Sequence, residues 1–251
     1  FRKAAVLDRV RPDPGTGLVV TRDAAPTAAL RRSRRALVAT TFATAVAFLA
    51  TAIDPHHRAT WLLESLPVLV ILPVLWLTHA RVPLTPLLYG LIAIPLVMLC
   101  VGAHYTFERV PLGDWLQSTL GLERNPYDRL GHVVQGFVPA IAAREVLVRH
   151  SPLARSRWLA PLVIALCLAI SAAYELVEWG VAVYADERAD AFLGMQGDPW
   201  DAQWDMLCAL AGAVLALALL SRAHDRALAT LLGRSAAVRG TLRGTSRRAT
   251  P

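Results

Sequence analysis

A stripe of polar side chains follows one face of a helix predicted in the middle of the chain. Asp128, His132 and Gln135 stand at spacings of i, i+4 and i+7, which place them on one side of an α-helix. Arg129 adds a positive charge next to them. Ionisable groups within an apolar membrane segment cost about 2.5–3.5 kcal/mol each to insert, so their positions carry information about function.

Two acidic pairs follow in later apolar segments. Glu175 and Glu178 are spaced i, i+3, and Asp201 and Asp205 are spaced i, i+4, so each pair shares a helical face. Because consecutive spans run in opposite directions, we expect all of these groups to lie near the same membrane surface. Carboxylates and a histidine that converge at low dielectric have three explanations: a divalent metal site, proton transfer, or a polar network that joins helices.

For the metal and proton-transfer explanations, the sequence suggests a role for each residue. We expect His132 or Glu175 to transfer a proton as the catalytic residue. The expected ligands of a divalent metal are Glu178, Asp201 and Asp205, and the supporting residues are Asp128, Arg129 and Gln135. The sequence does not identify a cofactor beyond this option of a divalent metal.

Helix capping is the alternative explanation for the acids nearest the helix ends. The strings Asn125-Pro126-Tyr127-Asp128 and Asp198-Pro199-Trp200-Asp201 both combine a capping residue, a proline at the first helical position and an acid in the first turn. Asp128, Asp198 and Asp201 can therefore satisfy backbone amides and the helix dipole alone. Capping does not explain the deeper residues, which are His132, Glu175, Glu178 and Asp205.

Six apolar segments would position these residues. The chain has 251 residues, of which 55% are hydrophobic and 18% charged, and its mean hydropathy is +0.43, above the usual value for a soluble domain. A helix rises about 1.5 Å per residue, so each segment can cross about 30 Å of hydrocarbon. We predict an all-α, polytopic transmembrane bundle with six spans, at Ala36–Ala52, Trp61–His79, Thr85–His104, Pro126–Val148, Trp158–Tyr184 and Pro199–Ser221.

The distribution of basic residues predicts that both termini are cytoplasmic. In that orientation the only basic residues outside, of 26 in the chain, are Arg58, Arg109, Arg124, Arg129 and Arg188, as the positive-inside rule requires. The basic residues that give the chain its net charge of +7 then orient the spans and contact anionic lipid, so no nucleic-acid partner is expected. We expect a multi-pass protein of a bacterial plasma membrane, whose partners are the lipid bilayer and an envelope or lipid-linked small molecule. The oligomeric state does not follow from the sequence.

The same patterns divide the chain into four regions. Residues 1–35 form a mobile basic cytoplasmic tail, 36–104 three N-terminal spans, 105–221 the three spans with the polar site and two long outer loops, and 222–251 a second basic cytoplasmic tail. In the last region we expect a short helix on the inner membrane face that buries Leu228, Leu231 and Leu232. Near the inner end of the fourth span, the i, i+4 spacing of Glu145 and Arg149 predicts an ion pair.

Several enzyme classes are excluded by motif. The sequence contains no P-loop, dinucleotide fingerprint, HExxH, GxSxG or CxxC pair. Three functions remain: an enzyme acting on an envelope or lipid-linked substrate, a module that binds or transports a cation or amine, and an accessory protein whose polar network is structural. The inner halves of the spans are nearly all apolar, which disfavours transport.

From about His104 to Arg226 the chain resembles the YjdF family of bacterial inner-membrane proteins, which is defined by a domain of unknown function, DUF2238. The resemblance implies a location in the inner membrane and brings no activity with it. It is carried by Pro111-Leu112-Gly113-Asp114-Trp115, Tyr127-Asp128-Arg129-Leu130-Gly131-His132, Gln135-Gly136-Phe137, Tyr174-Glu175-Leu176, Glu178-Trp179, Trp200-Asp201 and Gln203-Trp204-Asp205-Met206, among other strings.

A weaker resemblance leads to VanZ-like membrane proteins. Their pattern is Asp-Lys-x-x-His, Glu-x-x-Gln and Asp-x-x-x-Asn-x-x-Gly on successive helices, and Asp128 with His132 is similar to its first element. Glu178 stands where the second element has glutamine, and Ala209 stands where the third has asparagine. These departures add negative charge and remove an amide, so a shared ligand does not follow.

Overall fold

The computed structural model describes residues 24–185 and 196–233, and its secondary structure there is entirely helical. The 3-10 turns are η1 (Phe107–Arg109) and η2 (Pro152–Arg155). The α-helices are α1 (Ala24–Thr51), α2 (Arg58–Glu64), α3 (Leu66–His79), α4 (Pro86–Tyr105), α5 (Pro111–Leu120), α6 (Tyr127–His150), α7 (Leu159–Ala185) and α9 (Asp201–Leu231).

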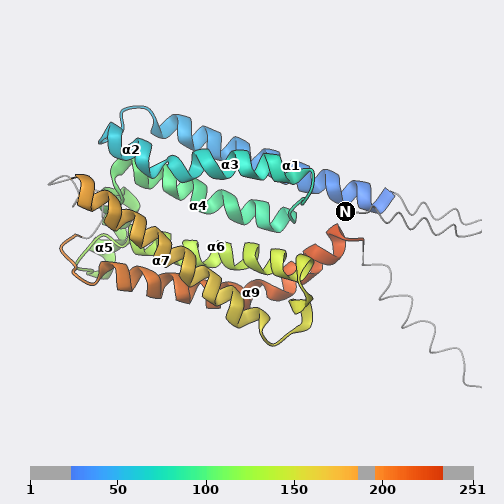
Figure 1. Cartoon of the computed structure of the whole chain (residues 1–251). Coiled ribbons are helices and arrows are strands. Elements are labelled where there is room, and N and C mark those ends of the chain that lie inside the picture. The colour runs from blue at the N-terminus through green and yellow to red at the C-terminus, as the bar shows by residue number, and fades with distance from the viewer. Residues whose placement is uncertain (1–23, 186–195, 234–251) are drawn as a thin grey trace, which may run out of the picture.

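The long helices form two groups that lie side by side (Figure 1). One group contains α1, α3 and α4, and the other contains α6, α7 and α9. The short helices α2 and α5 lie at the same end of the bundle, which we call the α5 end. At the opposite end, which we call the α1 end, α1 begins and α9 finishes.

Four segments of the described chain are long and apolar enough to cross a membrane. They are Arg58–His79, Pro86–Tyr105, Leu159–Val181 and Asp201–Leu231. Large apolar side chains project outward from the bundle, and Leu77 and Leu219, for example, are 73% and 67% exposed. Such a surface is stable in hydrocarbon and unfavourable in water, which confirms a multi-pass membrane protein. The six spans and the cytoplasmic termini stay predictions.

The most extensive helix pairing joins α6 and α9. A Cβ added at Gly136 would overlap the carbonyl of Ala209, and one added at Gly212 would overlap the carbonyl of Val133. The two backbones therefore touch, which only glycine permits at these positions. This contact fixes how α6 and α9 are rotated about their axes, and hence which side chains face each other between them.

A buried ionic network holds the α1 end together. Glu145 is fully buried and accepts hydrogen bonds from the Thr85 backbone (3.1 Å), the Thr85 hydroxyl (2.8 Å) and Arg149 (2.9 Å). His224 Nε2 donates to Glu145 (3.0 Å), since His224 Nδ1 accepts from Arg144 (2.8 Å). The predicted Glu145–Arg149 pair is confirmed, and the network ties α6, α9 and the start of α4 together.

Two predicted boundaries differ from the structure. Helix α1 begins at Ala24, inside the predicted tail 1–35, because Ser33 is buried and its hydroxyl donates to the Leu84 carbonyl (2.7 Å). Helix α9 continues past residue 222 to Leu231, with His224 and Leu228 buried. No glycine or proline interrupts that segment, so the expected separate surface helix does not form. The rest of both tails lies outside the described residues.

Replacing Gly212 should test the contact between α6 and α9. Gly212→Ala places a methyl group against the Val133 carbonyl, so we expect it to lower the free energy of unfolding by about 1–3 kcal/mol. Gly180→Ala on α7 is the matched control, because nothing lies within 4 Å of the added Cβ. Thermal unfolding of both variants in detergent measures the difference, and equal stability would contradict the close packing.

Removing Glu145 should weaken the α1 end. Glu145→Ala removes the carboxylate partner of the fully buried His224 and one acceptor of Arg149, which also donates to the Pro83 carbonyl, so we expect about 3–5 kcal/mol of destabilisation. Glu108→Ala serves as the control, because the one ion pair that Glu108 makes within the described part of the chain is with the exposed Arg109. Unfolding by denaturant measures both, and a Glu145→Ala variant as stable as the control would refute the role of this network.

Candidate functional site

His132 lies at the centre of the polar cluster near the α5 end. Its Nδ1 lies 2.9 Å from Gln135 Oε1, and since an amide oxygen only accepts, Nδ1 carries the proton and donates it. In the neutral ring the other nitrogen, Nε2, then presents a lone pair. It lies 3.7 Å from Asp128 Oδ1 and 3.9 Å from Asp205 Oδ2, and neither carboxylate offers it a proton when ionised.

These three side chains have the spacing of a metal-binding group. One ligand atom from each of Asp128, His132 and Asp205 lies within 4.8 Å of the others, and all three residues are buried. Helix α6 supplies Asp128 and His132 one turn apart, and α9 supplies Asp205 across the Gly136–Ala209 contact. Hydrogen bonding through Nδ1 is how proteins orient an imidazole that binds metal through Nε2.

Two arginines occupy the outer part of the cluster. Arg124 bonds Asp201 directly and lies 3.9 Å from Asp128 and from Asp198. Arg129 donates to Asp198 (2.7 Å) and lies over the ring of Trp204, 5.4 Å from its centroid. Asp201 is therefore paired with an arginine, unlike Asp205 four residues further along α9.

The acids deeper in the bundle have no arginine or lysine partner among the described residues. Asp205 is 2% exposed and its Oδ1 makes no hydrogen bond to a described residue, as is also true of Glu175 Oε1. Glu175 Oε1 lies 3.6 Å from His132 Nδ1, which is too long for a hydrogen bond. Acidic side chains therefore outnumber basic ones in the buried part of the cluster.

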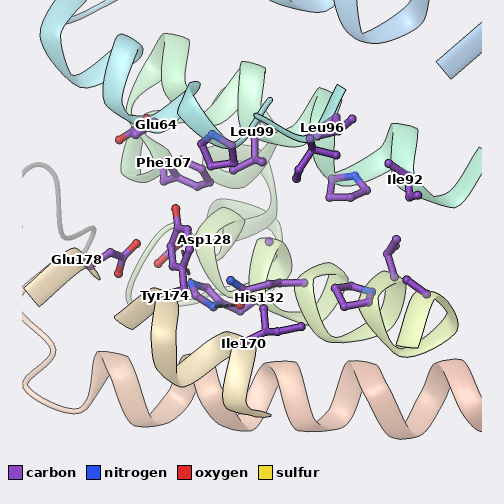
Figure 2. A pocket seen from close by; sticks show the side chains of 18 residues that line it. Glu64, Ile92, Leu96, Leu99, Phe107, Asp128, His132, Ile170, Tyr174 and Glu178 are labelled. Carbon is purple, nitrogen blue, oxygen red and sulfur yellow. Dashed lines mark hydrogen bonds and ion pairs between the residues drawn. The ribbon is translucent and has the colours of Figure 1, made fainter. Parts of the chain in front are cut away.

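A groove begins at the cluster and runs between the two groups of helices (Figure 2). Its volume is about 350 Å³, within the range of small-molecule sites. Figure 2 shows Glu64, Asp128 and Glu178 at one end of the groove and Ile92 and Leu96 further along. Glu178 thus faces the groove, whereas Glu175, three residues earlier on α7, lies beside His132.

The structure brings most of the predicted site residues together, in three arrangements. Around His132 lie four of the predicted residues, as the helical spacings suggested: Asp128, Asp205, Glu175 and Gln135. Glu178 lines the groove, and Asp201 and Arg129 belong to the arginine layer. The roles of these residues in metal binding and catalysis stay predictions.

Capping explains part of the acidic pattern. Asp198 Oδ1 accepts from the Trp200 backbone N–H (2.9 Å), and Asn125 Oδ1 accepts from the Tyr127 N–H (3.0 Å), at the starts of α9 and α6. Asp128 and Asp201 instead contact Arg124. Asp198 and Asn125 therefore bond backbone amides where the two helices start, whereas the N-cap residues themselves, Trp200 and Pro126, make no side-chain cap hydrogen bond.

Two further residues belong to this site although the sequence does not single them out. Arg124 stands i, i+4 from Asp128, a spacing that indicates an ion pair, but it precedes the helix and lies in the predicted outer loop. Tyr174 packs edge-on against His132, with ring centroids 6.0 Å apart. No local pattern marks Tyr174, because its neighbour comes from another helix.

Comparison with known proteins agrees with the membrane setting of the fold. Residues 36–226 match the family described as "Predicted membrane protein (DUF2238)". The chain is 50% identical over 178 residues to the inner membrane protein YjdF of Escherichia coli strain K12, and the match covers 71% of this chain and 85% of that protein. No solved structure matches the chain.

Replacing Arg124 should unbalance the cluster. In Arg124→Gln the buried Asp201 loses its direct cationic partner, so we expect about 3–5 kcal/mol of destabilisation. The control is Arg109→Gln, whose side chain is 57% exposed and whose loss should change stability by less than about 1 kcal/mol. Chemical denaturation in detergent measures both values. Similar losses in the two variants would show that Arg124 does not neutralise the outer acids.

Proposed function

We propose that the polar cluster of this chain, which belongs to the DUF2238 family of predicted membrane proteins, binds a divalent cation within the bacterial inner membrane. With that cation, the protein would act on an envelope or lipid-linked substrate. One observation carries the proposal. With the imidazole neutral and both acids ionised, the lone pair of His132 Nε2 lies near the carboxylates of Asp128 and Asp205, while Arg124 lies 3.9 Å from the other oxygen of Asp128. A cation relieves this repulsion.

The donor set indicates which cations fit. Two carboxylates and one imidazole suit borderline and hard divalent ions such as Zn²⁺ or Mn²⁺ better than soft ions. Asp128, His132 and Asp205 would be the ligands in this arrangement. Asp128 then replaces Asp201 in the predicted set, because Asp201 is bonded to Arg124, and Glu178 lies at the groove beyond the three ligands.

Glu175 is the residue best suited to proton transfer in such an enzyme. Its Oε1 is buried, makes no hydrogen bond to a described residue and lies on the Nδ1 side of His132, away from the proposed ligand atoms. A bound cation would supply Lewis acidity at a substrate oxygen or water, and the proton released there would reach Glu175 through an intervening water or substrate group. His132, as a ligand, would then not be the base.

The predicted orientation determines which compartment this site serves. With six spans and both termini cytoplasmic, the α5 end faces away from the cytoplasm, so the site faces outward. This orientation is supported by the basic residues at the α1 end, where Arg144 and Arg149 accompany the arginines of α1. A substrate would then reach the site from the envelope or from within the outer leaflet.

A structural role is the second candidate, and one observation favours it. The Arg124 and Arg129 pairs connect α6 to α9 and to Asp198, so part of the cluster already fixes helix positions. An accessory protein would need no more than this. A module that binds a cation without chemistry would keep the metal and lack any role for Glu175.

Metal content tests the proposal directly. We expect the protein, purified in detergent and dialysed against Zn²⁺ or Mn²⁺, to retain about one equivalent by elemental analysis. The double variant Asp128→Asn, Asp205→Asn should lose at least about tenfold in affinity, because the amides cannot replace two carboxylate ligands. Glu175→Gln should retain the metal, since Glu175 is not in the ligand set.

Glu123→Gln is the control for this measurement, because Glu123 is exposed on the loop before α6. Thermal unfolding with and without metal gives an independent readout, since a ligand of the native state raises its stability. If neither the protein nor the control retains metal, or if the double variant binds as well as the parent, the cation site does not exist and the structural role is favoured.

A further inference from the structure

The groove at the polar cluster is amphipathic along its length. Its polar end is formed by Glu64, Asp128, His132, Tyr174 and Glu178. Beyond them the lining is apolar apart from Gln135, with Ile71, Ile92, Leu96, Leu99, Val138 and Ile170. A ligand that fills this groove needs a polar head at the α5 end and an apolar chain pointing toward the α1 end.

The groove is also long and narrow enough for a chain. The lining of α6 extends from Asp128 to Ala142, which corresponds to roughly 20 Å along the helix axis at about 1.5 Å per residue. Helices α4 and α6 pack together at its base, and residues of α3 and α7 line its two sides. Since α3 and α7 belong to the apolar segments that cross the membrane, the groove lies at hydrocarbon depth.

The charge at the polar end selects the kind of head. Glu64, Asp128 and Glu178 line it, and none of the described residues that line the groove is lysine or arginine. Glu64 is 5% exposed, and its Oε2 is buried without a hydrogen-bond partner among the described residues. A buried carboxylate oxygen that faces a cavity is stabilised by a cationic hydrogen-bond donor and repels an anion.

We propose that the groove binds a single-chain amphiphile with an amine head, whose ammonium group contacts Glu64 and Glu178 and whose chain lies along α4 and α6. This assignment names the class of ligand for the site proposed above. It rests on the proposed function only through Asp128 and His132, the two residues that the cation site and the groove share. Glu64, Glu178 and Ile170 belong to the groove alone, so the two proposals are separable by experiment.

Photocrosslinking in phosphatidylcholine nanodiscs tests the ligand class. Three probes share a hexadecyl chain with a diazirine and differ in their head, which is an amine, an alcohol or a phosphate. We expect the amine probe to label α4 and α6 at the groove, with saturation and with displacement by unlabelled hexadecylamine. A charge-assisted hydrogen bond is about twice as strong as a neutral one, so the amine should bind about tenfold more tightly than the alcohol.

Two pairs of variants locate the head and the chain. Glu64→Gln should weaken amine binding about tenfold, whereas Glu123→Gln should leave it unchanged. Ile170→Trp fills the groove and should abolish saturable labelling, whereas Leu176→Trp, on an exposed face of the same helix, should not. Circular dichroism and thermal unfolding establish that each variant is folded before binding is compared.

The outcomes separate this inference from the cation site. Saturable amine labelling that survives in the metal-free Asp205→Asn variant supports the groove assignment even if no metal binds. Equal labelling by alcohol and amine, preference for the phosphate probe, or labelling that Ile170→Trp leaves intact would overturn it. Preference for the phosphate probe only in the metal-loaded protein would keep the cation site and reject the amine head.

Discussion

The contact between the backbones of α6 and α9 determines the arrangement of the polar cluster. Gly136 and Gly212 remove the side chains that would keep the helices apart, and the axes approach until carbonyl groups are reached. At that distance short side chains from both helices meet, so Asp205 reaches His132. With a larger residue at either glycine, the same acids would be separated by apolar side chains.

The bundle contains two buried ionic clusters with different balances of charge. At the α1 end, Glu145 accepts from Thr85, Arg149 and His224, so its carboxylate oxygens are satisfied. At the α5 end, Asp205 and Glu175 keep oxygen atoms without hydrogen-bond partners among the described residues. The cluster at the α1 end shows that this fold can join helices through buried polar groups whose oxygen atoms are all hydrogen-bonded. The cluster at the α5 end differs, because some of its carboxylate oxygens have no such partner where the cluster meets the groove.

The sequence predicted the helical faces well, because the spacing of residues such as Asp128 and His132 follows directly from the period of an α-helix. It also predicted that the last three long helices would contribute to one cluster, because hydrophobic length and alternating direction fix the depth of each residue. The helical secondary structure and the membrane setting followed from composition and apolar length. The ends of α1 and α9 did not, because burial of Ser33 and His224 depends on contacts with distant segments.

Pairing across the cluster could not be predicted in the same way. Which acid of α9 lies beside Asp128 and His132 depends on Arg124, which binds Asp201 and leaves Asp205 next to the imidazole, and the position of Arg124 depends on the path of the chain before α6. The division of Glu175 and Glu178 between two places depends on the rotation of α7 relative to α6. Periodicity constrains faces within one helix but says nothing about rotation between helices.

Because α7 is one continuous helix, Glu175 beside His132 and Glu178 in the groove move as parts of one rigid rod. An occupant that draws Glu178 inward also changes where Glu175 stands relative to the imidazole. Thermodynamic linkage then makes the effect reciprocal. If occupancy of the groove changes the affinity for a ligand at His132 by some factor, that ligand changes the affinity for the groove occupant by the same factor. Tyr174, which contacts the imidazole and also lines the groove, lies on the same rod and adds to this coupling.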